Sequence, residues 1–224
     1  MRGLSIIDVD HKAIDRLNAE ALNLDGTLKV MPSEFYQQFR QDDLCGFCMF
    51  NGFYCLPTIE LLDYIHRLIA EVSPTRSAIE IGSGNGVLGR GLGIPCTDNL
   101  MQTRPEIIEH YARVGQPVIK YGEHVEELDA LKAIHVYTPD VVVAAWVTHT
   151  YDPKDHARGG NMYGVDEKLL LSKIKRYVFV GNMTTHELKP LLTIPHREIR
   201  GDFLFSRGRV PEDNVLLVWD GGLA

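Results

Sequence analysis

Residues 79–86 of this chain are IEIGSGNG. Their first three residues end a short apolar run that begins at Ser77, and the glycine-rich residues 82–86 follow it. Every second residue from Gly82 to Gly86 is a glycine, and residues 87–92 then have the composition of a short helix. Because glycine lacks a Cβ, such a turn can adopt backbone angles closed to other residues and lets a ligand approach the main chain. The stretch therefore predicts a strand, a tight turn and a helix, with a ligand site at the turn.

Apolar runs and helical patterns alternate along the chain after this turn. Strands are expected at residues 77–81, 94–97, 118–121, 140–147, 177–180, 203–206 and 215–219, and helices at residues 87–92, 105–114, 125–134 and 166–175. Such alternation predicts a doubly wound α/β fold with a mostly parallel, seven-stranded sheet. No helix is expected between the last two strands, so one strand near the C-terminus should be antiparallel. In the helix at 105–114, Ile107, Ile108 and Tyr111 are expected to face inward.

The first 75 residues differ from the rest. Helices are expected at residues 10–22, 33–41 and 58–73, whereas residues 44–54 show no clear period. Thr58 is a candidate N-cap, because its hydroxyl can accept a hydrogen bond from a free backbone N–H. We therefore divide the chain into an N-terminal helical or lid segment, residues 1–75, and an α/β domain, residues 76–224. Phe50 and Tyr54 are candidates for shaping a substrate pocket, although plain core packing is the favoured explanation of the aromatic residues there.

Composition and charge exclude several classes of protein. The chain has 224 residues, of which 45% are hydrophobic, so it can bury a full core and is neither disordered nor fibrous. The formal net charge of −7 argues against nucleic acid as a partner. No stretch has the length of a membrane span, and the first residues do not resemble a signal peptide, so we expect a cytoplasmic protein without a membrane partner. Residues 141–224 carry slightly more basic than acidic groups, which favours that part for an anionic substrate.

The pattern Glu-x-Gly-x-Gly-x-Gly at residues 80–86 resembles the first motif of the class I S-adenosylmethionine (SAM) dependent methyltransferases, and the likeness covers roughly residues 76–220. The resemblance implies SAM as cofactor, with its methionine end held by Glu80, Gly82, Ser83, Gly84, Asn85 and Gly86. It also implies that Asp98, after the second strand, binds the ribose hydroxyls, and that Glu123 and His124, after the third, bind the adenine. Carboxylates suit these positions because hydroxyls and an amino group are hydrogen-bond donors.

The end of the fourth expected strand, residues 146–152, is where this family usually places residues on the substrate side. Trp146 is a candidate cofactor contact there, and His149, Tyr151 and Asp152 are candidate catalytic residues. His149 could act as a general base, since histidine gains and loses a proton near neutral pH, and Asp152 could orient it. A polar loop without chemistry is the alternative, and we expect no metal.

The resemblance thus predicts methyl transfer from SAM to a small molecule or a peptide side chain. The alternative is a regulatory module that binds SAM or a nucleoside without catalysis, since residues 146–153 match no substrate motif that we recognise. An NAD-binding site is also conceivable, because Gly84, Gly86 and Gly89 fit the spacing G-x-G-x-x-G. That register, however, would require the strand to run through Gly82.

Simpler explanations also exist for several of these residues. Asp98 could cap a helix or lie in a solvated turn, and Glu123 could favour a helix start through the helix dipole. Cys45, Cys48 and Cys55 could bind zinc or act in redox chemistry, but zinc needs a fourth ligand, and buried cysteines commonly serve as small apolar side chains.

Two further segments of the last third have both a functional and a structural explanation. Residues 159–164, with paired glycines and Tyr163, could be a mobile substrate loop or a plain connection. Lys168, Lys173, Lys175 and Arg176 are expected to form a solvated helix face.

Overall fold

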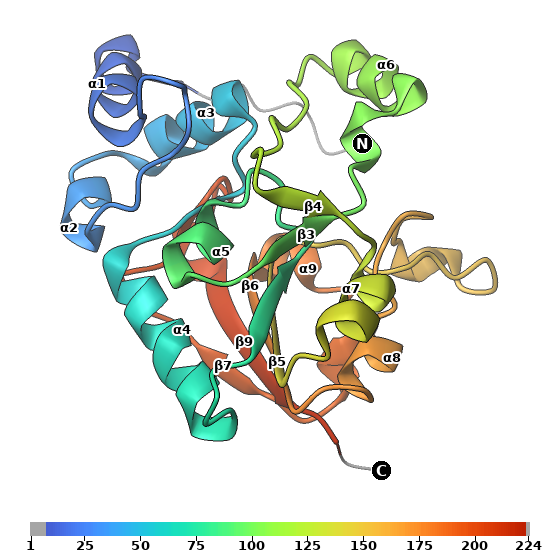
Figure 1. The fold of residues 1–224 in the computed structure, drawn as a ribbon. Helices are drawn as coiled ribbons and strands as arrows, with labels where there is room; N and C mark the ends of the chain where they lie inside the picture. Colours follow the sequence, from blue (N-terminus) through green and yellow to red (C-terminus); the bar gives the residue numbers. More distant parts are fainter. Residues whose placement is uncertain (1–7, 223–224) are drawn as a thin grey trace.

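The computed structural model describes residues 8–222, which fold around a seven-stranded sheet of order β4-β3-β2-β5-β6-β9-β7 (Figure 1). The strands are β2 (Ala78–Ile81), β3 (Cys96–Asp98), β4 (Val125–Glu127), β5 (Val141–Ala145), β6 (Arg176–Asn182), β7 (Arg197–Ile199) and β9 (Asn214–Asp220). β9 pairs antiparallel with both β6 and β7, whereas the other pairs are parallel. The predicted fold, a mostly parallel seven-stranded sheet with one antiparallel strand near the C-terminus, is confirmed.

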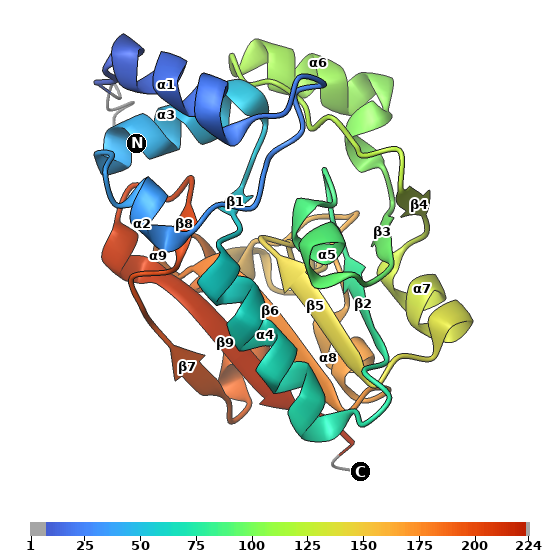
Figure 2. The same ribbon diagram turned by 60° about the vertical axis from the view of Figure 1, so that its left-hand side comes forward.

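Helices cover both faces of this sheet. One face packs against α4 (Ile59–Val72) and α5 (Val87–Leu92), and the other against α7 (Ala130–Tyr137) and α8 (Glu167–Leu171). Figure 2 shows α4 lying across β5, β6 and β9, with α8 behind them. Successive residues of the central strands alternate between the two cores, as side chains on a pleated strand must. A strand buried on both faces, such as β5, is therefore apolar along its whole length.

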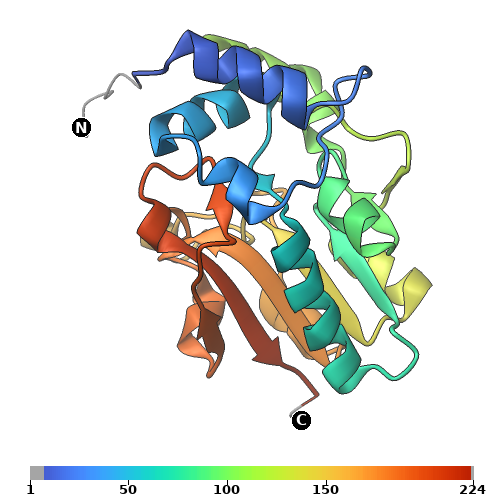
Figure 3. The ribbon, with the colours of Figure 1, turned by 90° about the vertical axis from the view of Figure 1, so that its left-hand side faces the viewer.

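A third core lies at the end of the sheet where the parallel strands terminate. It is built from α1 (His11–Ala21), α2 (Ser33–Tyr36) and α3 (Gln41–Asn51). The strand β1 (Cys55–Leu56) pairs antiparallel with β8 (Phe205–Ser206) and ties this segment to the C-terminal part of the chain. In Figures 2 and 3, α1, α3 and α6 (Pro105–Arg113) lie together above the sheet.

Short helical turns complete the structure. They are η1 (Met101–Thr103), η2 (His156–Arg158), α9 (Met183–His186), η3 (Pro190–Thr193) and η4 (Pro211–Asp213). Nowhere in residues 8–222 is a helix long and apolar enough to cross a bilayer.

The helix α4 forms as the sequence predicts. The Oγ1 atom of Thr58 accepts a hydrogen bond from the backbone N–H of Leu61, 3.1 Å away, and caps the first turn. The buried side chains of α4 form one stripe that faces the sheet, namely Leu61, Leu62, Ile65, Leu68 and Ile69. Burial of each contributes about 1.5–3 kcal/mol to the free energy of folding. The helix ends at Val72, two residues before Pro74.

The prediction for the third strand is wrong. Residues 118–121 are irregular, and the backbone N–H of Ile119 donates to Oε1 of Gln102 at 2.9 Å rather than to a neighbouring strand. The third strand is β4, where the sequence predicted a helix, and α7 starts only at Ala130. β4 is an edge strand whose side chains are half-buried or exposed, so its sequence, Val-Glu-Glu, lacks the apolar run that marks a buried strand.

Other expectations also differ from the structure. The segment 44–54 contains most of helix α3, and residues 203–206 supply β8 of the small sheet, while the sixth strand of the main sheet is β7. No residue of α6 is fully buried, and Ile108 is 43% exposed, so the inward position predicted for Ile108 is wrong, whereas Ile107 and Tyr111 are half-buried. Arg176 is not on a solvated face, because it is 4% exposed and forms ion pairs with Glu71 and Asp220.

Candidate cofactor and acceptor site

A cavity of about 780 Å³ opens at the carboxyl ends of β2, β3 and β5. Gly82, Asp98 and Trp146, which follow or end these three strands, all line it. β3 and β5 flank β2 on opposite sides, so the chain order reverses at this point of the sheet. Open α/β sheets bind ligands at such a switch point.

Gly82, the first residue of the glycine turn, lines this cavity, whereas Gly84 and Gly86 do not. Gly82, Gly84 and Gly86 have φ angles of +55°, +56° and +71°, in the left-handed region that favours glycine. A Cβ on Gly82 would lie 2.4 Å from Cγ1 of Val147, so the close approach also requires glycine. Ser83 ties the turn to β3, because its Oγ donates to the carbonyl oxygen of Thr97 at 2.7 Å.

Asp98 ends β3 and faces the cavity although its side chain is almost fully buried, at 7% exposed. One carboxylate oxygen accepts from the N–H of Gly84 and the other from the N–H of Leu100, each at 2.9 Å. Burial raises the pKa of this carboxyl group above its usual range. Each carboxylate oxygen has a second lone pair, so Asp98 can hold the turn and still accept from a ligand hydroxyl.

Glu80 lies beneath the turn, in a separate hollow of about 50 Å³ that Gly82 and Gly84 also line. The side chain is 1% exposed, and its Oε2 accepts from the N–H of Gly89 at 2.9 Å. Burial raises the pKa of Glu80 to about 8, so the carboxyl group is mainly protonated at neutral pH. Oδ1 of Asn85 accepts from the N–H of Val87, the first residue of α5, at 3.0 Å.

The structure does not bring Glu123 and His124 to the site. Glu123 is exposed and lines neither hollow, because the strand expected before it does not exist. Nε2 of His124 lies 3.1 Å from the carbonyl oxygen of Gly86, and His124 does not line the cavity. The residues after β4 that do line the cavity are Leu128 and Ala130, which offer an apolar wall. The assignment of Glu123 and His124 to an adenine site therefore loses its structural basis.

Trp146 directly follows β5 and lines the cavity with a left-handed φ of 58°. Its ring centroid lies 5.9 Å from that of Tyr54 and 5.0 Å from that of His186. The indole Nε1 is buried and has no hydrogen-bond partner among the residues that the structure describes. An unpartnered N–H beside a cavity is a donor available to a ligand.

His149 also lines the cavity and is 9% exposed. Its Nε2 lies 2.9 Å from the carbonyl oxygen of Arg158. A carbonyl oxygen only accepts, so Nε2 carries the proton of the neutral ring and Nδ1 holds the basic lone pair.

The other two catalytic candidates do not reach the cavity. The hydroxyl of Tyr151 contacts Nδ1 of His156, and neither residue lines the cavity. Asp152 is exposed, and its Oδ1 accepts from the N–H of Lys154 at 2.8 Å. Asp152 therefore does not orient His149, because the Arg158 carbonyl takes that part.

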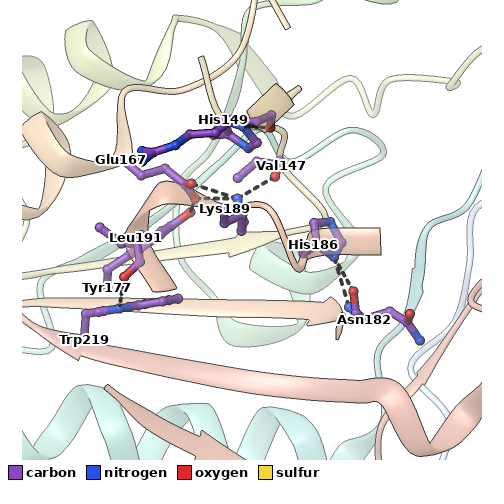
Figure 4. A network of polar contacts seen from close by, with 10 residues as sticks. Val147, His149, Glu167, Tyr177, Asn182, His186, Lys189, Leu191 and Trp219 are labelled. Carbon is purple, nitrogen blue, oxygen red and sulfur yellow. Dashed lines mark hydrogen bonds and ion pairs between the residues drawn. The ribbon is translucent and has the colours of Figure 1, made fainter. Parts of the chain in front are cut away.

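A buried polar network that the sequence analysis missed supports the cavity wall (Figure 4). Lys189 is 3% exposed, and its Nζ donates to both carboxylate oxygens of Glu167 at 2.8 Å and to the carbonyl oxygen of Val147 at 2.9 Å. The Tyr177 hydroxyl donates to the same carboxylate at 2.8 Å. The network holds the backbone directly after Trp146, and no motif in the sequence marks these scattered residues.

His186 is a second residue that the sequence analysis missed. It lines the cavity, and its Nδ1 lies 2.8 Å from the carbonyl oxygen of Asn182. Burial, with a smaller contribution from Lys189, lowers the pKa of His186 to about 4, so its ring is neutral at physiological pH. It packs edge-on against Trp146 and Phe179 and fixes the indole in place.

The cysteines form no metal site. Cys45, Cys48, Cys55 and Cys96 are buried and free, and in the described part of the chain no three His, Cys, Asp or Glu side chains lie together in an arrangement that could hold a metal ion. Burial raises the pKa of the Cys55 thiol to about 12 and that of Cys48 well above its usual range, which keeps both protonated.

Two of the three aromatic candidates, Tyr54 and Tyr163, line the cavity. Tyr54 does so from the N-terminal segment, whereas Phe50 is 59% exposed and does not line it. Tyr163 lines it from the loop 159–164, where Arg104 lies over its ring at 4.5 Å and Asn99 donates to its carbonyl oxygen at 3.1 Å.

The glycine turn after β2 and the carboxylate at the end of β3 lie as the resemblance implied, and β9 is antiparallel as the sequence predicted. The chain has the fold of the class I SAM-dependent methyltransferases. No protein-family model and no curated protein matches its sequence.

Several solved structures are similar to parts of it. The rRNA methylase of Streptococcus thermophilus is 12% identical, with 71% of this chain and 96% of that chain covered and a TM-score of 0.41. The putative methyltransferase SMU.776, complexed with S-adenosylhomocysteine (SAH), is 7% identical, with 69% and 48% covered and a TM-score of 0.34. The tRNA (uracil-54, C5)-methyltransferase of Pyrococcus abyssi, also in complex with SAH, is 14% identical, with 70% and 37% covered and a TM-score of 0.33. The matches thus span about half of SMU.776 and just over a third of the Pyrococcus chain.

The expectation that nucleic acid is an unlikely partner is wrong. An rRNA methylase and a tRNA methyltransferase are among the solved structures that the chain matches. Net charge is also a poor guide to this site, because the chain carries −7 overall while Arg158, Arg207 and Arg209 line the cavity.

Proposed function

We propose that this protein transfers a methyl group from SAM to an acceptor bound in the cavity. The observation that carries the proposal is the position of Asp98, which faces the cavity directly beside the left-handed glycine turn. A buried carboxylate there suits a ligand with vicinal hydroxyls. Because glycines have no Cβ, the other end of such a ligand can approach the main chain of the turn. Gly82 to Gly86 would hold the methionine end and Asp98 the ribose, while Leu128 and Ala130 offer an apolar wall to the base.

SAM supplies an electrophilic methyl group on a sulfonium, which a nucleophile displaces in line. The protein's part is to align the two reactants and to exclude water. Trp146 and Tyr54 form an aromatic wall on the acceptor side, and His149 offers Nδ1 to take a proton from the nucleophile. The cavity volume, about 780 Å³, suits the cofactor together with a small molecule, a single peptide side chain or a single base.

Calorimetry with SAM and SAH tests the cofactor assignment. We expect both to bind, and Asp98→Asn to weaken binding by about 10- to 100-fold, since hydrogen bonds to a charged group contribute about 1.5–3 kcal/mol. Glu123→Gln is the matched control, because Glu123 is an exposed carboxylate that lines neither hollow. A folded wild-type protein that binds neither compound would refute the proposal.

A module that binds SAM without catalysis is the second candidate. It is favoured by the environment of His149, whose ring is held by a backbone carbonyl and not by a carboxylate. Incubation of a lysate with the protein and methyl-labelled SAM separates the two functions. Labelled product that depends on the protein, and that decreases with His149→Ala while SAH binding persists, supports the enzyme, and its absence supports the silent module.

A further inference from the structure

Cationic side chains outnumber carboxylates in the lining of the cavity, although the protein is acidic overall. The lining, within residues 8–222, contains one carboxylate, Asp98, and four cationic side chains, Arg158, Lys189, Arg207 and Arg209. The whole chain has a formal net charge of −7. A cation in the lining of a cavity attracts anionic ligands when no carboxylate neutralises it. The suitability of this cavity for an anion therefore depends on a cation that lacks a carboxylate partner.

Most of these cations have a carboxylate close by. Lys189 is paired with Glu167 at 2.8 Å, Arg158 with Asp155 at 2.8 Å, and Arg209 lies 4.0 Å from Asp42. Arg207 differs, because in the described structure no carboxylate oxygen lies within 4.0 Å of its guanidinium. Its Nη2 donates to Oε1 of Gln116, a neutral amide, at 3.1 Å. A guanidinium has five N–H donors in a planar fork, so Arg207 retains the geometry for two parallel bonds to an anion.

Backbone pairing holds Arg207 in place. Its N–H donates to the carbonyl oxygen of Tyr54 at 3.1 Å, which extends the β1–β8 ladder by one pair. The guanidinium carbon lies over the Tyr54 ring, 4.5 Å from the centroid. The Tyr54 hydroxyl in turn lies 3.2 Å from that of Tyr111. Arg207 is thus half-buried on an ordered aromatic support, unlike a surface arginine free in solvent.

The same wall offers flat apolar surface and a further donor. The Tyr54 ring lies close both to the guanidinium of Arg207 and to the ring of Trp146, whose centroid is 5.9 Å away. The buried Nε1 of Trp146 has no partner in the described chain and needs an acceptor atom from a ligand. Aromatic side chains bind planar rings by stacking, and both donors select for ligand atoms that accept hydrogen bonds.

We infer that the methyl acceptor is a planar ring that bears an anionic group, a carboxylate or a phosphate, and that Arg207 binds this group. The inference rests on the proposed function, since it names the substrate of the same site. A free aromatic acid and a nucleotide unit both have this chemistry.

Binding of paired probes to the SAH-saturated protein tests the inference. The pairs are benzoate with benzamide and uridine 5′-monophosphate with uridine, whose members differ in the anionic group. Tryptophan fluorescence reports the binding, because Trp146 lines the cavity and Trp219, the other tryptophan, is 0% exposed. We expect the anionic member of at least one pair to bind about tenfold more tightly or better. A preference confined to benzoate indicates a free aromatic acid, and one shown by the nucleotide indicates a nucleotide acceptor.

Variants then assign the preference to a residue. Arg207→Gln should reduce the ratio of affinities for the anionic and the neutral probe to near unity, and Arg207→Lys should retain part of that ratio. Both variants should leave SAH affinity unchanged. Arg200→Gln is the control, because Arg200 is also in the last third of the chain, donates to Glu198 and does not line the cavity.

Equal binding of the paired probes, or no binding of any probe at millimolar concentration, would overturn the inference, and neither result depends on a variant folding. An anion preference that survives Arg207→Gln would overturn the role of Arg207. Failure of SAH to bind the wild-type protein is a separate result, which would refute the proposed function itself.

Discussion

Replacement of Gly82 by alanine should destabilise the protein by about 2–5 kcal/mol. The φ angle of +55° costs a residue with a Cβ about 1–2 kcal/mol. The new Cβ would also lie 2.4 Å from Cγ1 of Val147, and overpacking of this kind adds about 1–3 kcal/mol. Val147 cannot move away easily, because it is 8% exposed and Lys189 holds its carbonyl oxygen.

Gly93 provides the matched control. Its φ is +66°, but a Cβ there would meet nothing within 4 Å, so Gly93→Ala should cost only the backbone contribution, about 1–2 kcal/mol. Urea unfolding of both variants measures the difference, and calorimetry measures SAH binding to the folded proteins. We expect SAH binding to weaken at least about tenfold in Gly82→Ala and to be unchanged in Gly93→Ala. Equal losses of stability in the two variants would show that the contact with Val147 has no weight.

Three further predictions follow from buried titratable groups. Glu80 has a folded pKa of about 8 against an ordinary 4.5, so its contribution to the free energy of unfolding is full below about pH 4.5 and is lost as pH rises to about 8, by at most about 5 kcal/mol. Glu80→Gln should flatten the dependence of urea-derived stability on pH between these values, and an unchanged dependence would contradict the raised pKa. His186 has a folded pKa of about 4 against an ordinary 6.5, so its contribution to the free energy of unfolding is lost as pH falls from about 6.5 to 4. His186→Gln should remove this loss of stability in the same urea assay, and a loss that persists in the variant would come from another group. Lys189→Met leaves Glu167 buried without its ion pair and should cost about 3–5 kcal/mol in urea unfolding, with partial recovery when Glu167→Gln is added; a loss below about 1 kcal/mol would argue against the pair.

The parts of the fold that the sequence predicts are those with a strong local signal. α4 has both a capping threonine and an apolar stripe at helical spacing, and β5 is a continuous apolar run that is buried on both faces. The glycine turn is recognisable because the left-handed angles at Gly82, Gly84 and Gly86 leave little choice of residue. Asp98 follows from its place at the end of a strand next to that turn.

The edge of the sheet could not be predicted in the same way. β4 is placed by pairing with β3, and its exposed glutamates carry no hydrophobic signal, whereas the more apolar residues 118–121 pair with no strand. The assignment of Glu123 to a cofactor site depended on the end of the strand expected at residues 118–121, so it lost its basis together with that strand. α3 was missed because six successive residues, 43–48, are all buried, so its apolar residues show no helical period.

The residues that support the cavity are brought together only by tertiary structure. Glu167 and Lys189 are 22 positions apart, and Tyr54 meets Arg207 across most of the chain. A buried lysine and a solvated lysine look alike in a sequence, which also explains why Arg176 was expected on a polar surface. His149 was found because it follows a buried strand, but its orienting partner, the carbonyl of Arg158, is a backbone atom that no side-chain motif can indicate.

The packing of α4 has a consequence for how this chain folds. The helix is formed by residues 59–72, yet the side chains that cover its apolar face belong to strands that follow much later, including β6 and β9. Local signals can start the helix early, but its burial must await contacts that close loops of more than 100 residues, and such long-range closure slows folding. During synthesis the apolar stripe therefore emerges from the ribosome long before its partners exist, which makes this segment a natural binding site for a chaperone until β9 is in place.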